Sequence, residues 1–143
     1  MVMAVMAALH ARPAPPRKPE ARLGSLVAYL RASVICPHDD RERCHVLFVD
    51  ARRTCLGDAA IGRGGRGALS LRMREIFGEA LRLDAHGIIL AHNHPSGECR
   101  PSGCDISATR QLAAVARALD IELIDHLIFT TRAVYSMRAG GLL

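Results

Sequence analysis

The chain has 143 residues, of which half are hydrophobic, a formal net charge of +5 and five cysteines. This length is typical of one domain with a single core, and no stretch is long and apolar enough for a membrane-spanning helix. The odd cysteine count, without a Cys-x-x-Cys pair, argues against a disulfide framework or a four-cysteine zinc knuckle, so we expect reduced thiols and a cytoplasmic protein.

The first half of the chain predicts a tail, a helix and two strands. Residues 1–22 combine prolines with mixed charge and are expected to form a disordered tail, with the domain spanning residues 23–143. Leu23 to Ala32 places its apolar residues on one helical face. His45 to Asp50 and Thr54 to Ile61 are β-rich, and they predict an antiparallel pair.

The second half predicts two further helices and several short strands. Gly62 to Gly67 favours a flexible loop over a phosphate cradle, because no Lys-Ser/Thr pair follows it. Ser70 to Leu83 predicts a helix with Ser70 as its N-cap, and Asp105 to Leu119 predicts another. The expected strands are Ile88 to Leu90, Ile121 to Ile124, His126 to Thr130 and Ala133 to Met137, the last two forming a hairpin. This order favours an α/β (α+β sandwich) fold with one mixed β-sheet flanked by helices.

Two histidines end the buried strand that begins at Gly87. His92 and His94 are separated by one residue, so in an extended backbone they face the same side. Asp105 falls in the first turn of the following helix, where its carboxylate can supply a third ligand. Three protein ligands with an open fourth position are typical of catalytic zinc, so the pattern predicts a Zn²⁺ site.

Two alternatives compete for residues of this motif. Ser102 and Asp105 also have the spacing of a helix capping box, which needs no metal, although capping and metal binding are compatible. Cys99 and Cys104 flank the loop, and thiolates are good zinc ligands. We interpret these cysteines as ordinary small side chains in preference to ligands.

The motif resembles the JAMM signature of the MPN/JAB metallopeptidases, which is His-x-His, seven residues, Ser, two residues, Asp. A longer resemblance is to the JAB domain of bacterial RadC proteins. It rests on His-Asn-His-Pro-Ser-Gly at 92–97, Arg-Glu-Ile-Phe at 74–77 and Leu-Ile-Asp-His at 123–126. The resemblance implies the JAB/MPN (cytidine-deaminase-like) fold and a zinc-dependent hydrolase of an amide or isopeptide bond in a peptide or protein substrate.

Catalytic roles follow from the same resemblance. The family's general base is a glutamate at an early strand, and Glu42 stands in that register, with Glu75 as the competing candidate. Ser102 is implied to hydrogen-bond the developing oxyanion. His126 is interpreted as a packed or surface histidine in preference to a partner that orients a metal ligand.

A non-enzymatic module is the alternative function, either DNA-associated, as the family's link with DNA repair suggests, or partner-binding. The positive charge permits nucleic-acid binding, but the arginines are scattered and the chain has few aromatic residues for base stacking. The helical region that precedes the domain in full-length RadC proteins has no counterpart in this sequence, so we expect a domain that acts alone or with a partner. A homo-oligomer is left open.

Overall fold

A five-stranded mixed sheet forms the centre of the computed structural model, which describes residues 23–63 and 71–143. The elements are α2 (Leu23–Val34), β1 (Arg43–Val49), β2 (Cys55–Arg63), α3 (Met73–Arg82), β3 (Gly87–Asn93), α4 (Gly103–Ala118), β4 (Glu122–Phe129) and β5 (Val134–Ser136). The strand order is β2-β1-β3-β4-β5, and β3 and β4 are parallel while the other pairs are antiparallel. The predicted fold class is therefore confirmed.

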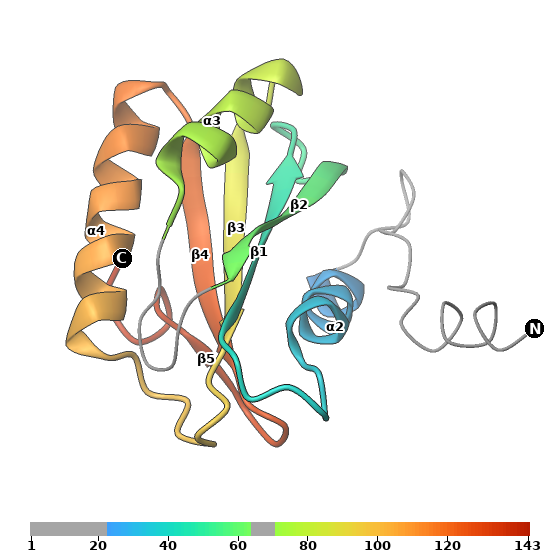
Figure 1. The fold of residues 1–143 in the computed structure, drawn as a ribbon. Coiled ribbons are helices and arrows are strands. Elements are labelled where there is room, and N and C mark those ends of the chain that lie inside the picture. The colour runs from blue at the N-terminus through green and yellow to red at the C-terminus, as the bar shows by residue number, and fades with distance from the viewer. Residues whose placement is uncertain (1–22, 64–70) are drawn as a thin grey trace, which may run out of the picture.

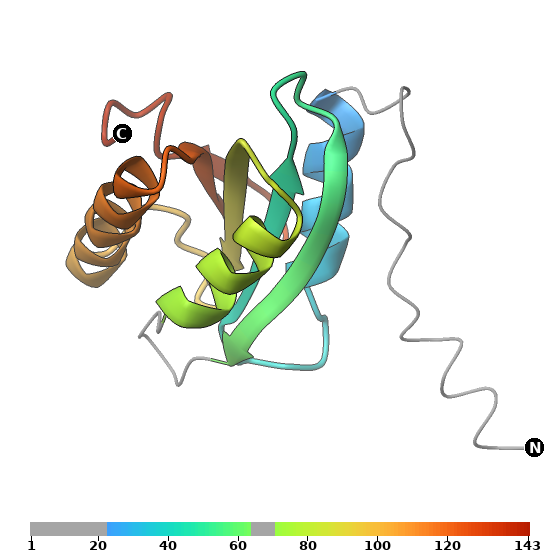
Figure 2. The same cartoon turned by 90° about the horizontal axis from the view of Figure 1, so that it is seen from above.

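The helices cover both faces of this sheet. Helices α3 and α4 lie on one face and α2 lies on the other, as the two views make clear (Figure 1, Figure 2). Alternation along the central strands divides the core accordingly: Ile88 and Leu90 of β3 pack with α3 and α4, whereas Ile89 and Ala91 pack with α2. The same alternation turns the next side chain of that series, His92, towards the α4 face.

The strand β4 differs from the sequence prediction. Two short strands were expected, interrupted at Asp125, but Glu122–Phe129 is one continuous strand with a register shift opposite Ile88 and Ile89. The Asp125 carboxylate accepts hydrogen bonds from the His126 N–H at 2.7 Å and from the Ser136 hydroxyl at 2.5 Å. A polar residue that looked like a strand breaker is satisfied inside the sheet by β5.

The predicted start of helix α3 was wrong. The helix begins at Met73 with Arg72 at its N-cap position and has no side-chain cap. The predicted cap, Ser70, lies outside the described residues, as do residues 64–67 of the expected glycine loop and the expected tail at residues 1–22. Within the part of the chain that the structure describes, no helix has the length and apolar character needed to cross a membrane.

Candidate metal centre

The three predicted ligands converge at the carboxyl end of β3. His92 lies in β3, His94 follows it, and Asp105 lies in the first turn of α4. The Nε2 atoms of the two histidines are 2.9 Å apart, and the carboxylate oxygens of Asp105 lie 3.4 Å from Nε2 of His92 and 3.1 Å from Nε2 of His94. Neither Cys99 nor Cys104 belongs to this cluster. One ligand atom from each residue lies within 4.8 Å of the other two, which is close enough for the three to bind one divalent cation.

A backbone carbonyl fixes the orientation of the His94 ring. Nδ1 of His94 lies 2.7 Å from the Glu98 carbonyl oxygen, which can only accept a hydrogen bond. Nδ1 therefore carries the hydrogen, and in the neutral ring Nε2 presents its lone pair to the cluster. The hydrogen bond with Asp105 raises the pKa of His94, an effect that partial burial opposes.

The capping box of α4 fixes Asp105. The Ser102 N–H donates to Oδ2 of Asp105 at 2.7 Å, and the Asp105 N–H donates to the Ser102 hydroxyl oxygen at 3.1 Å. Burial works to raise the pKa of Asp105, but the two histidines and the Ser102 N–H beside its carboxylate hold that pKa well below its usual range. Asp105 therefore takes part in the capping box and also faces the cluster, so the two interpretations of the Ser102–Asp105 spacing are compatible.

The ring of His92 contacts a second buried histidine, His126. Nδ1 of His92 lies 2.6 Å from Nε2 of His126, and Nδ1 of His126 lies 2.6 Å from the Thr109 hydroxyl. All three side chains are fully buried, and burial holds the pKa of His126 well below its ordinary value. His126 is packed, as the sequence analysis preferred, and its ring also contacts His92, as the alternative interpretation requires. Thr109 lies one turn after Asp105 on α4, and this spacing is the sequence signal that could have indicated that Thr109 lies near the cluster.

Glu42 lies beside the cluster, immediately before β1. In the β1–β3 pair Cys44 is opposite His92, so the start of β1 lies next to the ligands. Burial raises the pKa of Glu42, whereas the adjacent histidines lower it. The Glu42 residue is 7% exposed, and its Oε2 atom has no hydrogen-bond partner among the described residues. Glu75, the competing candidate, is exposed on α3 and pairs with Arg72 at 2.8 Å.

Asn93, the residue between the two histidines, holds the segment that carries Glu42. Its side-chain oxygen accepts the Arg43 N–H at 2.5 Å, and its side-chain nitrogen donates to the Arg41 carbonyl at 3.2 Å. These two backbone groups flank Glu42 in the chain. The short β3 segment therefore sets the positions of both histidines and of the nearby glutamate.

The nitrogen and oxygen atoms that meet in the cluster are suited to bind a metal ion. The Nε2 atoms of both histidines and the Asp105 carboxylate face one another, and the Glu42 oxygen without a partner among the described residues lies nearby. Acceptors that converge in a buried place require a positive charge between them, either a proton shared by His94 and Asp105 or a metal cation. Imidazole nitrogens with one carboxylate are a common ligand set for zinc in enzymes.

A cleft of about 400 Å³ opens beside His94. Its walls come from the α2–β1 connection, including Cys36, His38 and Asp40, and from Pro95 and Gly97 after β3. A molecule in this cleft would therefore reach the ligand cluster from the side of the His94 ring.

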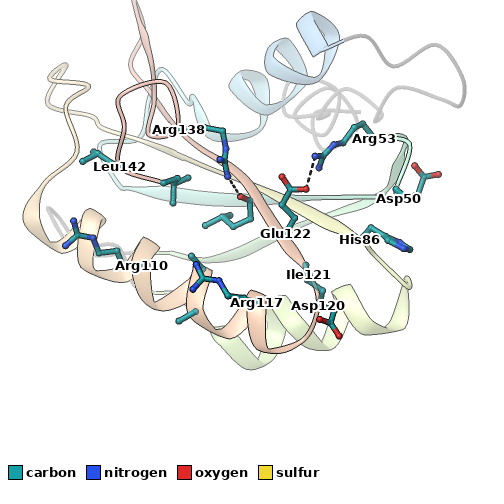
Figure 3. A pocket seen from close by; sticks show the side chains of 15 residues that line it. Asp50, Arg53, His86, Arg110, Arg117, Asp120, Ile121, Glu122, Arg138 and Leu142 are labelled. Atoms are coloured by element: carbon teal, nitrogen blue, oxygen red, sulfur yellow. Dashed lines mark hydrogen bonds and ion pairs between the residues drawn. The ribbon is translucent and has the colours of Figure 1, made fainter.

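A second, larger cleft, of about 820 Å³, lies away from the ligand cluster. Figure 3 shows that it opens between the α4 side chains Arg110 and Arg117 and the beginning of β4. The parallel strands β3 and β4 begin at this end of the sheet, whereas His92 stands where β3 ends. Acidic residues line it too, and Glu122 accepts a hydrogen bond from Arg53 at 2.8 Å. Its charge is mixed, which is unlike the basic footprint of a polyanion site.

A mixed sheet between helices, with a His-His-Asp cluster at the end of a central strand, defines the JAB/MPN class of domains. The chain belongs to the family described as the RadC-like JAB domain, whose family model matches residues 22–142.

Curated relatives agree with this assignment. The chain is 42% identical over 106 residues to a UPF0758 protein of Bordetella avium, an alignment covering 74% of this chain and 47% of that protein. It is 39% identical over 105 residues to a UPF0758 protein of Chloroflexus aggregans (73% and 46% covered) and 33% identical over 120 residues to one of Chlorobium chlorochromatii (84% and 53%). The chain thus spans about half the length of these relatives, and their shared name states no activity.

Proposed function

We propose that this domain is a zinc-dependent hydrolase that cleaves an amide or isopeptide bond in a peptide or protein substrate. The observation that carries the proposal is the convergence of His92, His94 and Asp105, all acceptors, beside the buried Glu42 oxygen that has no partner among the described residues. A domain that served only as a scaffold would have no physical need for a buried carboxylate oxygen without a hydrogen bond.

Each ligand already has its free atom directed into the cluster. The Glu98 carbonyl sets His94 and the capping box sets Asp105. A bound zinc ion would supply a Lewis acid there, lowering the pKa of a water towards about 7 and polarising the scissile carbonyl. Among the described residues three side chains would hold the ion, which would leave room at the metal for water and substrate.

Glu42 is the proposed proton carrier. Its burial raises the pKa of the carboxyl above the ordinary value, which makes the carboxylate a better base and its acid form more persistent. In this role Glu42 takes a proton from the attacking water and returns it to the leaving amine. Its place beside the ligands supports this assignment over Glu75, whose carboxylate is exposed and paired on α3.

Ser102 is the proposed oxyanion donor. Its hydroxyl oxygen accepts the Asp105 N–H, which leaves the hydroxyl hydrogen available to donate. A donor that meets charge only as it develops on the carbonyl oxygen stabilises the transition state more than the bound substrate. The cleft beside His94 is the proposed route by which the substrate reaches these groups.

The proposal is tested with a matched pair of substitutions in zinc-loaded protein. Glu42→Gln keeps the shape of the side chain but removes the proton carrier, and we expect turnover of a peptide or isopeptide library substrate to fall by at least ~10²-fold with zinc retained. Glu75→Gln is the control and should leave turnover unchanged. If neither substitution alters any measurable activity, or if zinc-loaded wild-type protein cleaves nothing in the library, the hydrolase proposal is rejected.

A further inference from the structure

We propose that Thr109 and His126 are positioning residues, which form a directed hydrogen-bond chain from the backbone of Asp105 to the ring of His92 and thereby fix the nitrogen of His92 that faces the cluster. This inference rests on the proposed metal site. It goes beyond that site because neither Thr109 nor His126 would touch the metal or the substrate.

The direction of the chain is set at Thr109. Its hydroxyl lies 2.6 Å from the Asp105 carbonyl oxygen, which can only accept, so the hydroxyl hydrogen points there. A contact from the same hydroxyl to the Met137 sulfur at 3.5 Å is with a weak acceptor, and it too directs the hydrogen away from His126. The Thr109 oxygen therefore accepts from Nδ1–H of His126 at 2.6 Å.

The next step passes this direction to the ligand. The ring nitrogens of His126 face an uncharged hydroxyl and another imidazole in a fully buried place, so a second ring proton would be a buried charge with no carboxylate bonded to it among the described residues. With its hydrogen on Nδ1, the ring therefore has a bare Nε2 atom, and that atom faces Nδ1 of His92 at 2.6 Å. The His92 hydrogen must therefore lie on Nδ1, which leaves Nε2 of His92 free on the side of His94 and Asp105. One fixed carbonyl thus decides the tautomers of two rings in succession.

Burial makes this order stringent. Thr109, His126 and His92 are each 0% exposed, so water cannot replace a missing partner at any link. A reversed or broken link would leave a buried polar atom unpaired. The chain also begins and ends at ligands, because Asp105 supplies the first carbonyl and His92 receives the last bond, so the α4 turn and the β3 strand are held in one arrangement.

A hydrogen-bonded partner on the second nitrogen of a histidine ligand typically changes metal affinity by 10–100-fold. In many sites this partner is a carboxylate or a backbone carbonyl. Here it is a neutral imidazole, which orients His92 without adding a negative charge beside Asp105. Breaking the hydrogen-bond chain should therefore weaken the orientation of the His92 ring and lower the affinity for zinc, while His92, His94 and Asp105 remain in place.

Two matched pairs of variants test the chain. Thr109→Val removes the hydroxyl at nearly constant volume, whereas Thr109→Ser keeps it. His126→Phe removes the acceptor for His92, whereas His126→Gln can place an amide oxygen near the former Nε2 position. We expect Thr109→Val and His126→Phe to weaken zinc binding by about 10–100-fold in competition with a chromophoric chelator, and Thr109→Ser and His126→Gln to retain most of the wild-type affinity. Thermal unfolding of the metal-free proteins checks that each variant folds.

A readout that needs no metal separates this inference from the proposed function. Nitrogen-15 chemical shifts of the histidine rings in metal-free wild-type protein should show His92 with its hydrogen on Nδ1, and Thr109→Val should weaken that preference. Wild-type His92 protonated on Nε2 instead, or equal zinc affinity across all folded variants, would overturn the chain. Failure of the wild-type protein to bind zinc would reject the proposed function, while the ring shifts would still decide the direction of the chain.

Discussion

Ser102 combines two roles that one set of substitutions can separate. Its hydroxyl oxygen caps α4 by accepting the Asp105 N–H at 3.1 Å, and the same hydroxyl is the proposed oxyanion donor. Its backbone N–H, which holds Oδ2 of Asp105 at 2.7 Å, survives any side-chain substitution. Ser102→Ala should therefore keep zinc while losing the cap and the donor together.

The magnitudes of the two losses differ in kind. Loss of the cap costs about 1 kcal/mol, which for a domain of this size lowers Tm by about 2–5 °C. Loss of an oxyanion donor lowers kcat by roughly 10²-fold with little change in KM. Glycine is a better N-cap than alanine by most of this stability difference, so Ser102→Gly should show nearly wild-type Tm and the same loss of rate as Ser102→Ala.

Peptidase kinetics, thermal unfolding and zinc content of the two variants together decide the matter. Equal rate losses with unequal Tm values would assign the rate effect to the hydroxyl hydrogen and the stability effect to the cap. Ser102→Ala protein with full kcat would refute the oxyanion role. Loss of zinc from Ser102→Ala would show that the cap, and not the backbone N–H of residue 102, holds Asp105.

Other predictions concern the glutamate segment, pH and nucleic acid. Asn93→Leu should retain zinc but lower kcat by about tenfold or more, because two backbone groups that flank Glu42 lose their partners; unchanged kinetics would contradict this. The hydrogen bond with Asp105 raises the pKa of His94, so zinc must displace a proton from this ring below that pKa. Zinc affinity measured by competition should therefore fall up to about tenfold per pH unit below the pKa of His94. A flat pH profile would count against His94 as a ligand. DNA binding in a fluorescence titration should be weak, independent of sequence and lost between low and physiological salt; salt-resistant, sequence-selective binding would favour the DNA-associated alternative.

The convergence of His92, His94 and Asp105 could be predicted from the sequence because most of its geometry is local. Gly87 to Ala91 is an apolar run that is recognisable as a buried strand, and a strand fixes the relative direction of His92 and His94. The Ser102 cap likewise fixes the start of α4, and with it the place of Asp105. Only the approach of α4 to the end of β3 is a tertiary feature, and the crossover between two parallel strands supplies it.

The parts that could not be predicted depend on partners distant in the sequence. His126 contacts His92 because β4 pairs in parallel with β3, and no pattern around residue 126 indicates this pairing. In the sequence Asp125 looks like the end of a strand, yet its carboxylate accepts hydrogen bonds from the Ser136 hydroxyl and the Arg138 N–H. The start of α3 was placed at Ser70 because serine is a good N-cap, but the helix begins at Met73 without a side-chain cap.

Zinc binding by wild-type and Asp105→Ala proteins is the most direct test of the metal centre. Elemental analysis after purification without chelator should find about one zinc ion per wild-type chain. Competition titration should show Asp105→Ala binding zinc at least ~10²-fold more weakly, since loss of a ligand exceeds the 10–100-fold cost of losing a hydrogen-bonded partner. Wild-type protein that binds no zinc at micromolar concentrations, or an Asp105→Ala protein that binds it as tightly as wild type, would contradict the assignment of His92, His94 and Asp105 as a metal site.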